Sequence, residues 1–401
     1  MCAMLQSCRK KWGDSVASIR KRTWKTGDET KTAWVADYFD PHGKRHLKTF
    51  RTKKEADTWL VATRREVQQG GHSSASASIT VEQAGEEWIV EAEADGLERG
   101  TIFQYRQHLN YHINPLIGET KLADLSVAGI KDFRGRLIRE GRSPIMVKKV
   151  LSSLGAILGN AMEGGRVAQN VVRVYTPRRR REDGLDQRHK RRIEVGVDIP
   201  TKDEIRAMLA QAQGWVRPLI VTAIFTGLRA SELRGLRWAD IDFDRAELTV
   251  RQRADRWGTI GSPKSGAARR TIPLAPMVVN TLRDWRLTCP QNNADLAFPT
   301  SKGRPRQTNT IHTHGLVPLQ LAAGIVSVVG GRPPRKPKYG LHSLRHAAAS
   351  LFIEQGLSPK RVQVLMGHSV IAVTFDTYGH LFPAPEDDRE AMRQLQARLV
   401  G

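Results

Sequence analysis

The sequence is short of cysteine, of acidic side chains and of long apolar runs, and each shortage excludes a class of protein. Three cysteines in 401 residues, Cys2, Cys8 and Cys289, cannot build a disulfide framework, and their spacing offers no CxxC metal site. No apolar run approaches the roughly 20 residues needed to cross a bilayer. No apolar stretch with a cleavage site marks the N-terminus for export. We therefore expect a cytoplasmic protein with no membrane partner.

Positive charge is what the chain has in excess. Lysine and arginine total 64 against 41 acidic residues, which gives a net charge of +23. Such a charge creates a long-range positive field, and nucleic acid is the commonest polyanion that matches it. Charge alone leaves open a ribosome-associated protein, a basic tail on an unrelated enzyme and a binder of membrane surfaces. A hydrophobic content of 40% supports packed cores, and 401 residues predict two to three domains.

Residues 1–72 have the pattern of a small module of strands and one helix. The pattern predicts strands at Val16–Trp24, Thr32–Phe39 and Lys44–Phe50, a turn at Asp40–Gly43 and a helix at Lys53–Gln69.

Basic side chains recur on these predicted strands. A three-stranded ribbon is narrow enough to enter a major groove of DNA. The predicted DNA contacts of this module are Arg20, Lys21, Arg22, Lys44 and Arg45. A solvated basic face is the alternative interpretation.

Residues 79–175 have a helical pattern throughout. Thr80 is the predicted N-cap of the first helix, with Gln83 at the capping-box position. Further helices are predicted at Thr101–Ile113, Ser126–Glu140 and Pro144–Gly164. A charged linker, residues 176–194, follows and contains Arg178, Arg179, Arg180 and Arg181. Its charge fits a crossing of the phosphate backbone, although a solubilising tether would have the same composition.

Residues 195–401 form the largest segment, with predicted helices, a hairpin region near 247–272 and a final helix at Pro385–Leu399. Four short motifs in it carry polar residues: TGLRASEL at 226–233, HSLRHAAAS at 342–350, LMGH at 365–368 and TFDTYGH at 374–380. Arg345 and His346 lie three and four positions after His342, so each projects from the same side of a helix as His342. No HExxH motif or cysteine partner accompanies them, which favours anion binding over a zinc site.

The order and spacing of these four motifs resemble those of the tyrosine recombinases, the lambda-type integrases, over residues 195–385. The resemblance implies an active-site set of Arg229, His342, Arg345, His368 and Tyr378. It also implies a lysine from the hairpin, for which Lys264 is the better match and Lys302 a competitor, and support of the first arginine by Glu232. Ala347 and Met366 stand where the family often has threonine and leucine.

The chemistry of these residue types suits cleavage of a phosphodiester. Two arginines can hold the non-bridging oxygens with paired hydrogen bonds and stay protonated. A tyrosine hydroxyl, with an ordinary pKa of about 10, needs a proton acceptor. We expect His342 as general base, His368 as a donor to the phosphate and Lys264 as general acid. The resemblance implies a 3′-phosphotyrosine at Tyr378, without a metal, cofactor or ATP.

The resemblance also implies the fold class, which is multidomain and mainly α. It comprises a small α+β arm-binding domain (1–72), an all-α core-binding domain (79–175) and a mixed α/β, mostly α, catalytic domain (195–401). The additional N-terminal module favours an integrase of a phage, prophage or integrative conjugative element. Implied partners are double-stranded DNA with core-type and arm-type sites, a homotetramer, a host DNA-bending factor and an excisionase.

Two alternatives stay open at this point. A type IB topoisomerase would use similar chemistry to relax supercoils. A catalytically inactive DNA-binding regulator could use the same scaffold.

Overall fold

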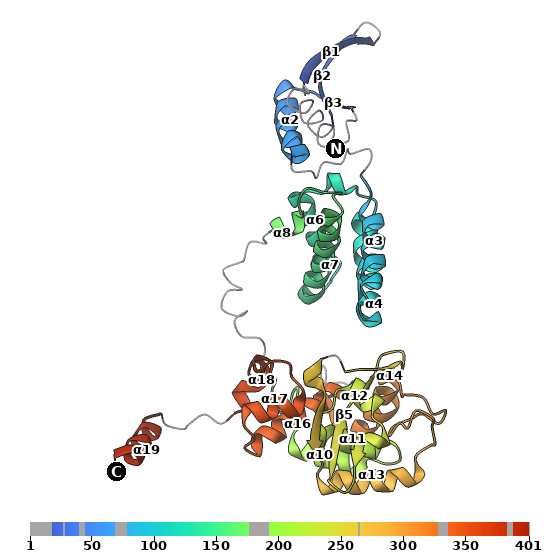
Figure 1. The fold of residues 1–401 in the computed structure, drawn as a ribbon, viewed down its shortest axis with the longest axis vertical. Helices are drawn as coiled ribbons and strands as arrows, with labels where there is room; N and C mark the ends of the chain where they lie inside the picture. The colour runs from blue at the N-terminus through green and yellow to red at the C-terminus, as the bar shows by residue number, and fades with distance from the viewer. Residues whose placement is uncertain are drawn as a thin grey trace, which may run out of the picture. The chain divides into compact units, whose positions relative to one another are not determined.

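The computed structural model describes residues 18–26, 29–39, 45–68, 78–175, 192–263, 265–327, 336–382 and 388–400 (Figure 1). The chain divides into two compact units, 1–180 and 181–401, and each is described here by itself. Helices dominate both units, and the sheets are small. This architecture confirms the fold class expected from the sequence.

The first unit begins with an antiparallel sheet of order β1-β2-β3 and one helix. Its elements are β1 Ser18–Thr26, β2 Glu29–Phe39, β3 Arg45–Phe50 and α2 Lys53–Gln68. Ala36 and Tyr38 on β2 pack with Leu60 of α2 and with Ile19 of β1. Side chains alternate along a strand. Arg20 and Arg22 therefore lie on the face of the sheet opposite to the one that bears Ile19.

Helices build the rest of this unit. They are α3 Val81–Ala94, α4 Arg99–His108, α5 Asn114–Ile117, α6 Val127–Arg139, α7 Pro144–Glu163 and α8 Val171–Val174. The predicted capping box is present, since Thr80 Oγ1 accepts from the Gln83 N–H at 3.2 Å and Gln83 Oε1 accepts from the Thr80 N–H at 3.0 Å.

One predicted helix is interrupted. A π turn at Leu109–Ile113 joins α4 to α5, where the sequence predicts a single helix from Thr101 to Ile113. Pro115, near the start of α5, has no N–H to donate to the carbonyl oxygen of Tyr111, which disfavours a regular α turn at this point.

Helix α7 meets the length and composition criteria for a membrane-spanning helix. This corrects the expectation that no apolar segment of the chain would be long enough. The core helix of a soluble protein meets the same criteria, and α7 lies in the core of the helical domain. Its Val150, Leu154 and Ile157 are 0% exposed and belong to the core of the helical domain.

The second unit surrounds the buried helix α11, Val216–Thr226, which packs against α13 and α16. The other helices are α10 Lys202–Gln211, α12 Ala230–Gly235, α13 Pro276–Thr288, α14 Thr308–Ile311, α15 Val317–Ala322, α16 Leu341–Glu354, α17 Pro359–Met366, α18 Ile371–Tyr378 and α19 Asp388–Val400.

A small antiparallel sheet of order β4-β5-β8 contains the predicted hairpin region. Its strands are β4 Ile241–Asp242, β5 Glu247–Val250 and β8 Arg270–Pro273. Two further pairs are β6 Arg253–Ala254 with β7 Ile260–Gly261, and β9 Val326–Ser327 with β10 Lys336–Pro337.

Two glycines allow the polar motifs to meet. Gly227 ends α11 with φ of 64°, and a Cβ there would lie 2.9 Å from Met366 Sδ and 3.1 Å from the Ala348 Cβ. Gly367 ends α17, also with φ of 64°, and a Cβ there would lie 2.8 Å from Nη1 of Arg270. Glycine adopts this left-handed conformation without strain. The ends of α11 and α17 can therefore approach α16 and β8 closely.

Candidate active site

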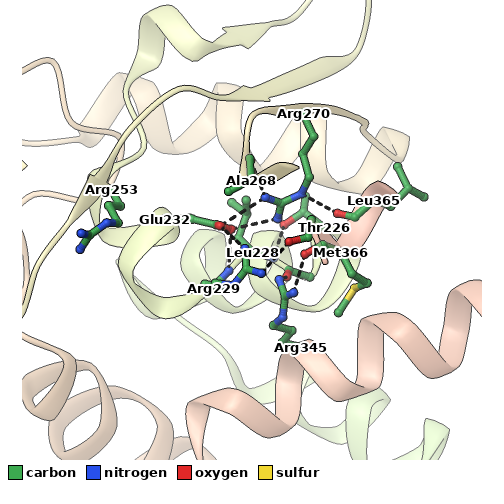
Figure 2. Close-up of polar contacts among 12 residues, drawn as sticks. Thr226, Leu228, Arg229, Glu232, Arg253, Ala268, Arg270, Arg345, Leu365 and Met366 are labelled. Atoms are coloured by element: carbon green, nitrogen blue, oxygen red, sulfur yellow. Dashed lines mark hydrogen bonds and ion pairs between the residues drawn. The ribbon is translucent and has the colours of Figure 1, made fainter. Parts of the chain in front are cut away.

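Arg229 and Arg345 come from different elements and bind the ends of α11 and α17 (Figure 2). Arg345, which is 4% exposed, donates from Nη1 to the carbonyl oxygen of Gly227 at 2.5 Å and from Nη2 to that of Met366. Arg229 donates from Nη2 to the carbonyl oxygen of Gly367 at 2.7 Å. The side chain of Arg229 is 33% exposed, so its guanidinium is accessible to a ligand.

A third arginine, Arg270 on β8, contacts the same carboxylate as Arg229. The side chains of Arg270 and Glu232 are each 2% exposed and are joined by two contacts of 2.9 and 3.2 Å. Glu232 also accepts from Nη1 of Arg229 at 2.7 Å, so one carboxylate orients both guanidinium groups. Nε of Arg270 donates to the carbonyl oxygen of Leu365 at 2.6 Å. This buried ion pair therefore connects β8, α12 and the end of α17.

Arg270 was not among the site residues predicted from the sequence, although a signal for it exists. Buried and exposed positions alternate along β8, and Arg270 shares the buried face with Ile272. A charged residue on the buried face of a strand needs a partner, and here the partner is Glu232.

Removing the charge of Glu232 should strongly destabilise the second unit. Burial alone would raise the pKa of Glu232, but the hydrogen bonds and charges of Arg270 and Arg229 hold it below its ordinary value. Glu232→Gln would leave Arg270 buried without a counter-charge. We expect a loss of about 3–5 kcal/mol in the free energy of unfolding, measured by urea denaturation.

A matched control for this substitution is Glu354→Gln. The ion pair between Glu354 and Lys202 has side chains that are 47% and 55% exposed, and we expect its loss to cost less than about 1 kcal/mol. Equal losses for the two variants would contradict the supporting position of Glu232.

Tyr378 ends α18, and its side chain lies inside the domain. It is 1% exposed and packs with Ala349 and Met366. Its hydroxyl lies 2.8 Å from Nδ1 of His346, and its ring stacks on that of His368 with centroids 6.2 Å apart and planes 11° apart. The phenol is thus fixed from two sides by imidazole rings.

Three histidines lie around the phenol and beside one another. His342 lies one turn before His346 on α16, and their rings meet edge to face with centroids 4.6 Å apart. His368 follows Gly367, and its Nδ1 lies 2.9 Å from the Thr374 hydroxyl. The structure therefore gathers the predicted His342, His368 and Tyr378 and adds His346. The sequence placed His346 on the same helix face as His342 but not in the site.

The surroundings set the protonation states of the site. Burial and the charge of Arg229 lower the pKa of Arg345 to about 10, so Arg345 stays cationic at neutral pH. Burial raises the pKa of Tyr378 to about 12, against the opposing charge of Arg345. Burial and neighbouring basic groups lower the pKa of His346 and of His368 to about 4. The site at rest combines cationic arginine, neutral imidazoles and a protonated phenol.

The other predicted residues are placed only in part. Arg20, Lys21 and Arg22 are exposed on β1. Nε of Arg45 donates to the two carboxylate oxygens of Asp37 at 2.9 and 3.1 Å, so much of its charge is already neutralised. Outside the described residues lie the predicted turn Asp40–Gly43 and Lys44, Arg178, Arg179, Arg180, Arg181 and Lys264.

Residues 200–384, which contain the whole of this arrangement, match the phage integrase family. The match covers the segment of the chain that carries Arg229, Arg345 and Tyr378. The recombinase resemblance seen in the sequence is thereby confirmed.

Curated relatives match nearly the whole length of this chain. A protein of Caldanaerobacter subterraneus subsp. tengcongensis named "Tyrosine recombinase XerC-like" is 26% identical over 90% of this chain and 94% of the relative. The integrase of Mycobacterium phage D29 is 24% identical over 88% of this chain and 91% of the relative.

A solved structure supports the fold across the domains. A lambda integrase dimer bound to a core site matches with a TM-score of 0.57 and 18% identity, over 91% of this chain and 97% of the lambda chain. At this identity the match concerns the fold alone.

Proposed function

We propose that this recombinase integrates or excises a phage or mobile element by cutting DNA with Tyr378 and forming a 3′-phosphotyrosine intermediate. The observation that carries the proposal is the position of the buried phenol beside the neutral imidazole of His346 and within the electrostatic reach of Arg345. The match to the phage integrase family and relatives named as integrases support the substrate class.

Each residue of the site has a separate role in the proposed reaction. Arg229 and Arg345 bind the non-bridging oxygens, where the attack of Tyr378 builds negative charge. His368 donates a hydrogen bond to the same phosphate. Lys264 protonates the leaving 5′ oxygen. The phosphodiester energy is retained in the phosphotyrosine, so rejoining needs no ATP.

The experiment that tests this function compares plasmids carrying two attachment sites with plasmids carrying none. We expect inversion or deletion of the segment between two sites, because a recombinase exchanges strands between paired duplexes. Relaxation of supercoils that is equally fast without any site would favour a type IB topoisomerase. DNA binding with no covalent product would favour an inactive regulator.

We propose that the chain is divided into an arm-binding domain at 1–72, a core-binding domain at 79–175, a linker at 176–194 and a catalytic domain at 195–401. The exposed Arg20 and Arg22, together with the match to lambda integrase over 91% of this chain, support an arm-binding function. Lys21 and Arg45, with Lys44 and the linker arginines 178–181, complete the proposed DNA contacts.

Deletion of residues 1–72 should separate cleavage from integration. We expect the truncated protein to cleave an isolated core site at a rate within a few-fold of the full chain, because the catalytic residues all lie beyond residue 195. Integration between full attachment sites should fall below detection. A two-plasmid integration assay compares the full chain with the truncated protein. Undiminished integration by the truncated protein would contradict the arm-binding function.

We further propose that Tyr378 attacks the DNA bound by its own subunit. Its side chain is packed against α16 and α17 of the same chain. A mixture of Tyr378→Phe and Arg345→Lys proteins should therefore form no more adduct than either variant alone. Recovery of cleavage in the mixture would mean that the tyrosine is donated to a neighbouring subunit.

We propose a homotetramer on DNA, in the cytoplasm, assisted by a host DNA-bending factor and an excisionase. A tetramer of lambda integrase on a Holliday junction has this fold, with a TM-score of 0.56. Val370, the N-cap of α18, is exposed, as are Ile371, Val373 and Phe375 on that helix. Helix α19 exposes Met392, Leu395, Leu399 and Val400. Apolar surfaces of this kind support contacts between subunits.

A further inference from the structure

The hydroxyl of Tyr378 has a specific partner, and it is not the histidine that the sequence analysis expected. In the described part of the chain, its hydrogen bond runs to Nδ1 of His346 at 2.8 Å, and no bond to His342 is present. His342 instead lies edge to face against His346. If the proposed function is correct, the group closest to the reacting oxygen is therefore His346.

We propose that His346 is the proton acceptor of the nucleophile. As the oxygen of Tyr378 bonds to phosphorus and the bond from phosphorus to the 5′ oxygen breaks, the phenolic proton passes to Nδ1 of His346. The leaving 5′ oxygen takes its proton from the general acid. Rejoining runs both transfers in reverse, so His346 returns the proton to the tyrosine.

The burial of the pair should keep the tyrosine unreactive in the free protein. With a pKa of about 4, His346 is neutral at physiological pH. In the tautomer that is protonated on Nε2, Nδ1 has a lone pair that can accept from the Tyr378 hydroxyl. With a pKa of about 12, Tyr378 keeps its proton. A DNA phosphate entering the arginine pocket adds negative charge, which stabilises protonated imidazole and strengthens His346 as a base. The nucleophile is thus activated chiefly when substrate is bound.

The groups around His346 fit this assignment. His342 and Arg345 on α16 disfavour its protonation, whereas Asp198, before α10, favours it. On the side of α18 the ring faces Tyr378, with ring centroids 5.7 Å apart. No other charged group need move for the proton to pass, because donor and acceptor are already in hydrogen-bond contact.

His346→Gln separates proton transfer from simple positioning. Glutamine can accept a hydrogen bond from the phenol but cannot take its proton at these pH values. We expect single-turnover cleavage of a nicked suicide substrate to fall roughly 10²–10⁴-fold, with DNA affinity and melting temperature close to those of the wild type. The wild-type rate should fall as the pH drops below the pKa of His346 in the complex, because protonated imidazole cannot accept. The variant should lack this dependence. A loss below tenfold, or an unchanged pH profile, would overturn the assignment.

A second measurement keeps the test independent of folding. A fluorinated tyrosine at position 378 has a phenol that loses its proton more readily, so it should restore much of the rate of His346→Gln. A purely structural defect would not respond to it, and no restoration would overturn the proposal. Wild-type protein that forms no adduct would contradict the proposed function itself, whereas a wild-type adduct with an unaffected variant would contradict the assignment of His346 alone.

Discussion

Tyr378→Phe should bind attachment-site DNA normally and form no covalent adduct. Phenylalanine keeps the ring that stacks on His368 and packs with Met366, so the local fold should remain. It removes only the oxygen that we propose as the nucleophile, together with one hydrogen bond to His346, worth about 1 kcal/mol. Denaturing gel electrophoresis after incubation with a nicked suicide substrate measures the adduct directly.

Tyr339→Phe is the matched control for this prediction. Tyr339 is also a buried tyrosine of the second unit, at 2% exposure, and its hydroxyl donates to Glu204 at 2.7 Å. Tyr339→Phe should also remove one buried hydrogen bond of a tyrosine hydroxyl, but it should leave formation of the covalent adduct unchanged. An adduct that persists in Tyr378→Phe, or that disappears in both variants, would contradict the role of Tyr378.

Loss of either arginine should slow cleavage far more than it weakens DNA binding. Arg345→Lys keeps a positive charge but loses the planar pair of donors that fits two phosphate oxygens. Arg229→Ala removes a partly exposed guanidinium whose intramolecular partners are Glu232 and one carbonyl oxygen. Because charge builds on the phosphate in the transition state, we expect each variant to lose roughly 10²–10³ in rate, or about 2.7–4 kcal/mol.

The measurement compares single-turnover rates at saturating protein with dissociation constants for the same DNA. Arg206→Ala is a suitable control, because the side chain of Arg206 is 73% exposed and its ion pair is with Asp203, which is 88% exposed. Its rate and affinity should both stay near the wild-type values. If the rates of Arg229→Ala and Arg345→Lys recover fully at high protein concentration, the arginines contribute to affinity and not to the chemical step.

Local features of the fold were predictable because their causes lie within a few residues of one another. The Thr80 capping box is encoded by two side chains three positions apart, and the end of α11 by Gly227. The π turn after α4 was not predicted, because it depends on Pro115 lying at a point where the helical pattern continues.

The sequence indicated several of the residues that the structure brings together, but it missed Arg270 and His346 and did not predict the contacts among the side chains. The motif resemblance predicted that Arg229, Arg345 and Tyr378 share one site. The spacing of the motifs along the sequence does not show which histidine contacts the hydroxyl of Tyr378. That choice depends on how α18 packs on α16, across 32 positions of sequence. The alternation along β8 indicates that Arg270 needs a buried partner, but it does not identify Glu232, which lies 38 positions away in the sequence.

Mapping of the covalent adduct tests the central claim most directly. After trapping on a nicked suicide substrate, tryptic digestion should leave the nucleotide on the peptide 362–389, in which Tyr378 is the only tyrosine of the chain's six. Fragmentation of that peptide should place a 3′-phosphate on the Tyr378 oxygen, with a free 5′-hydroxyl on the released strand. A nucleotide on another peptide, or one attached through a 5′-phosphate, would contradict the account.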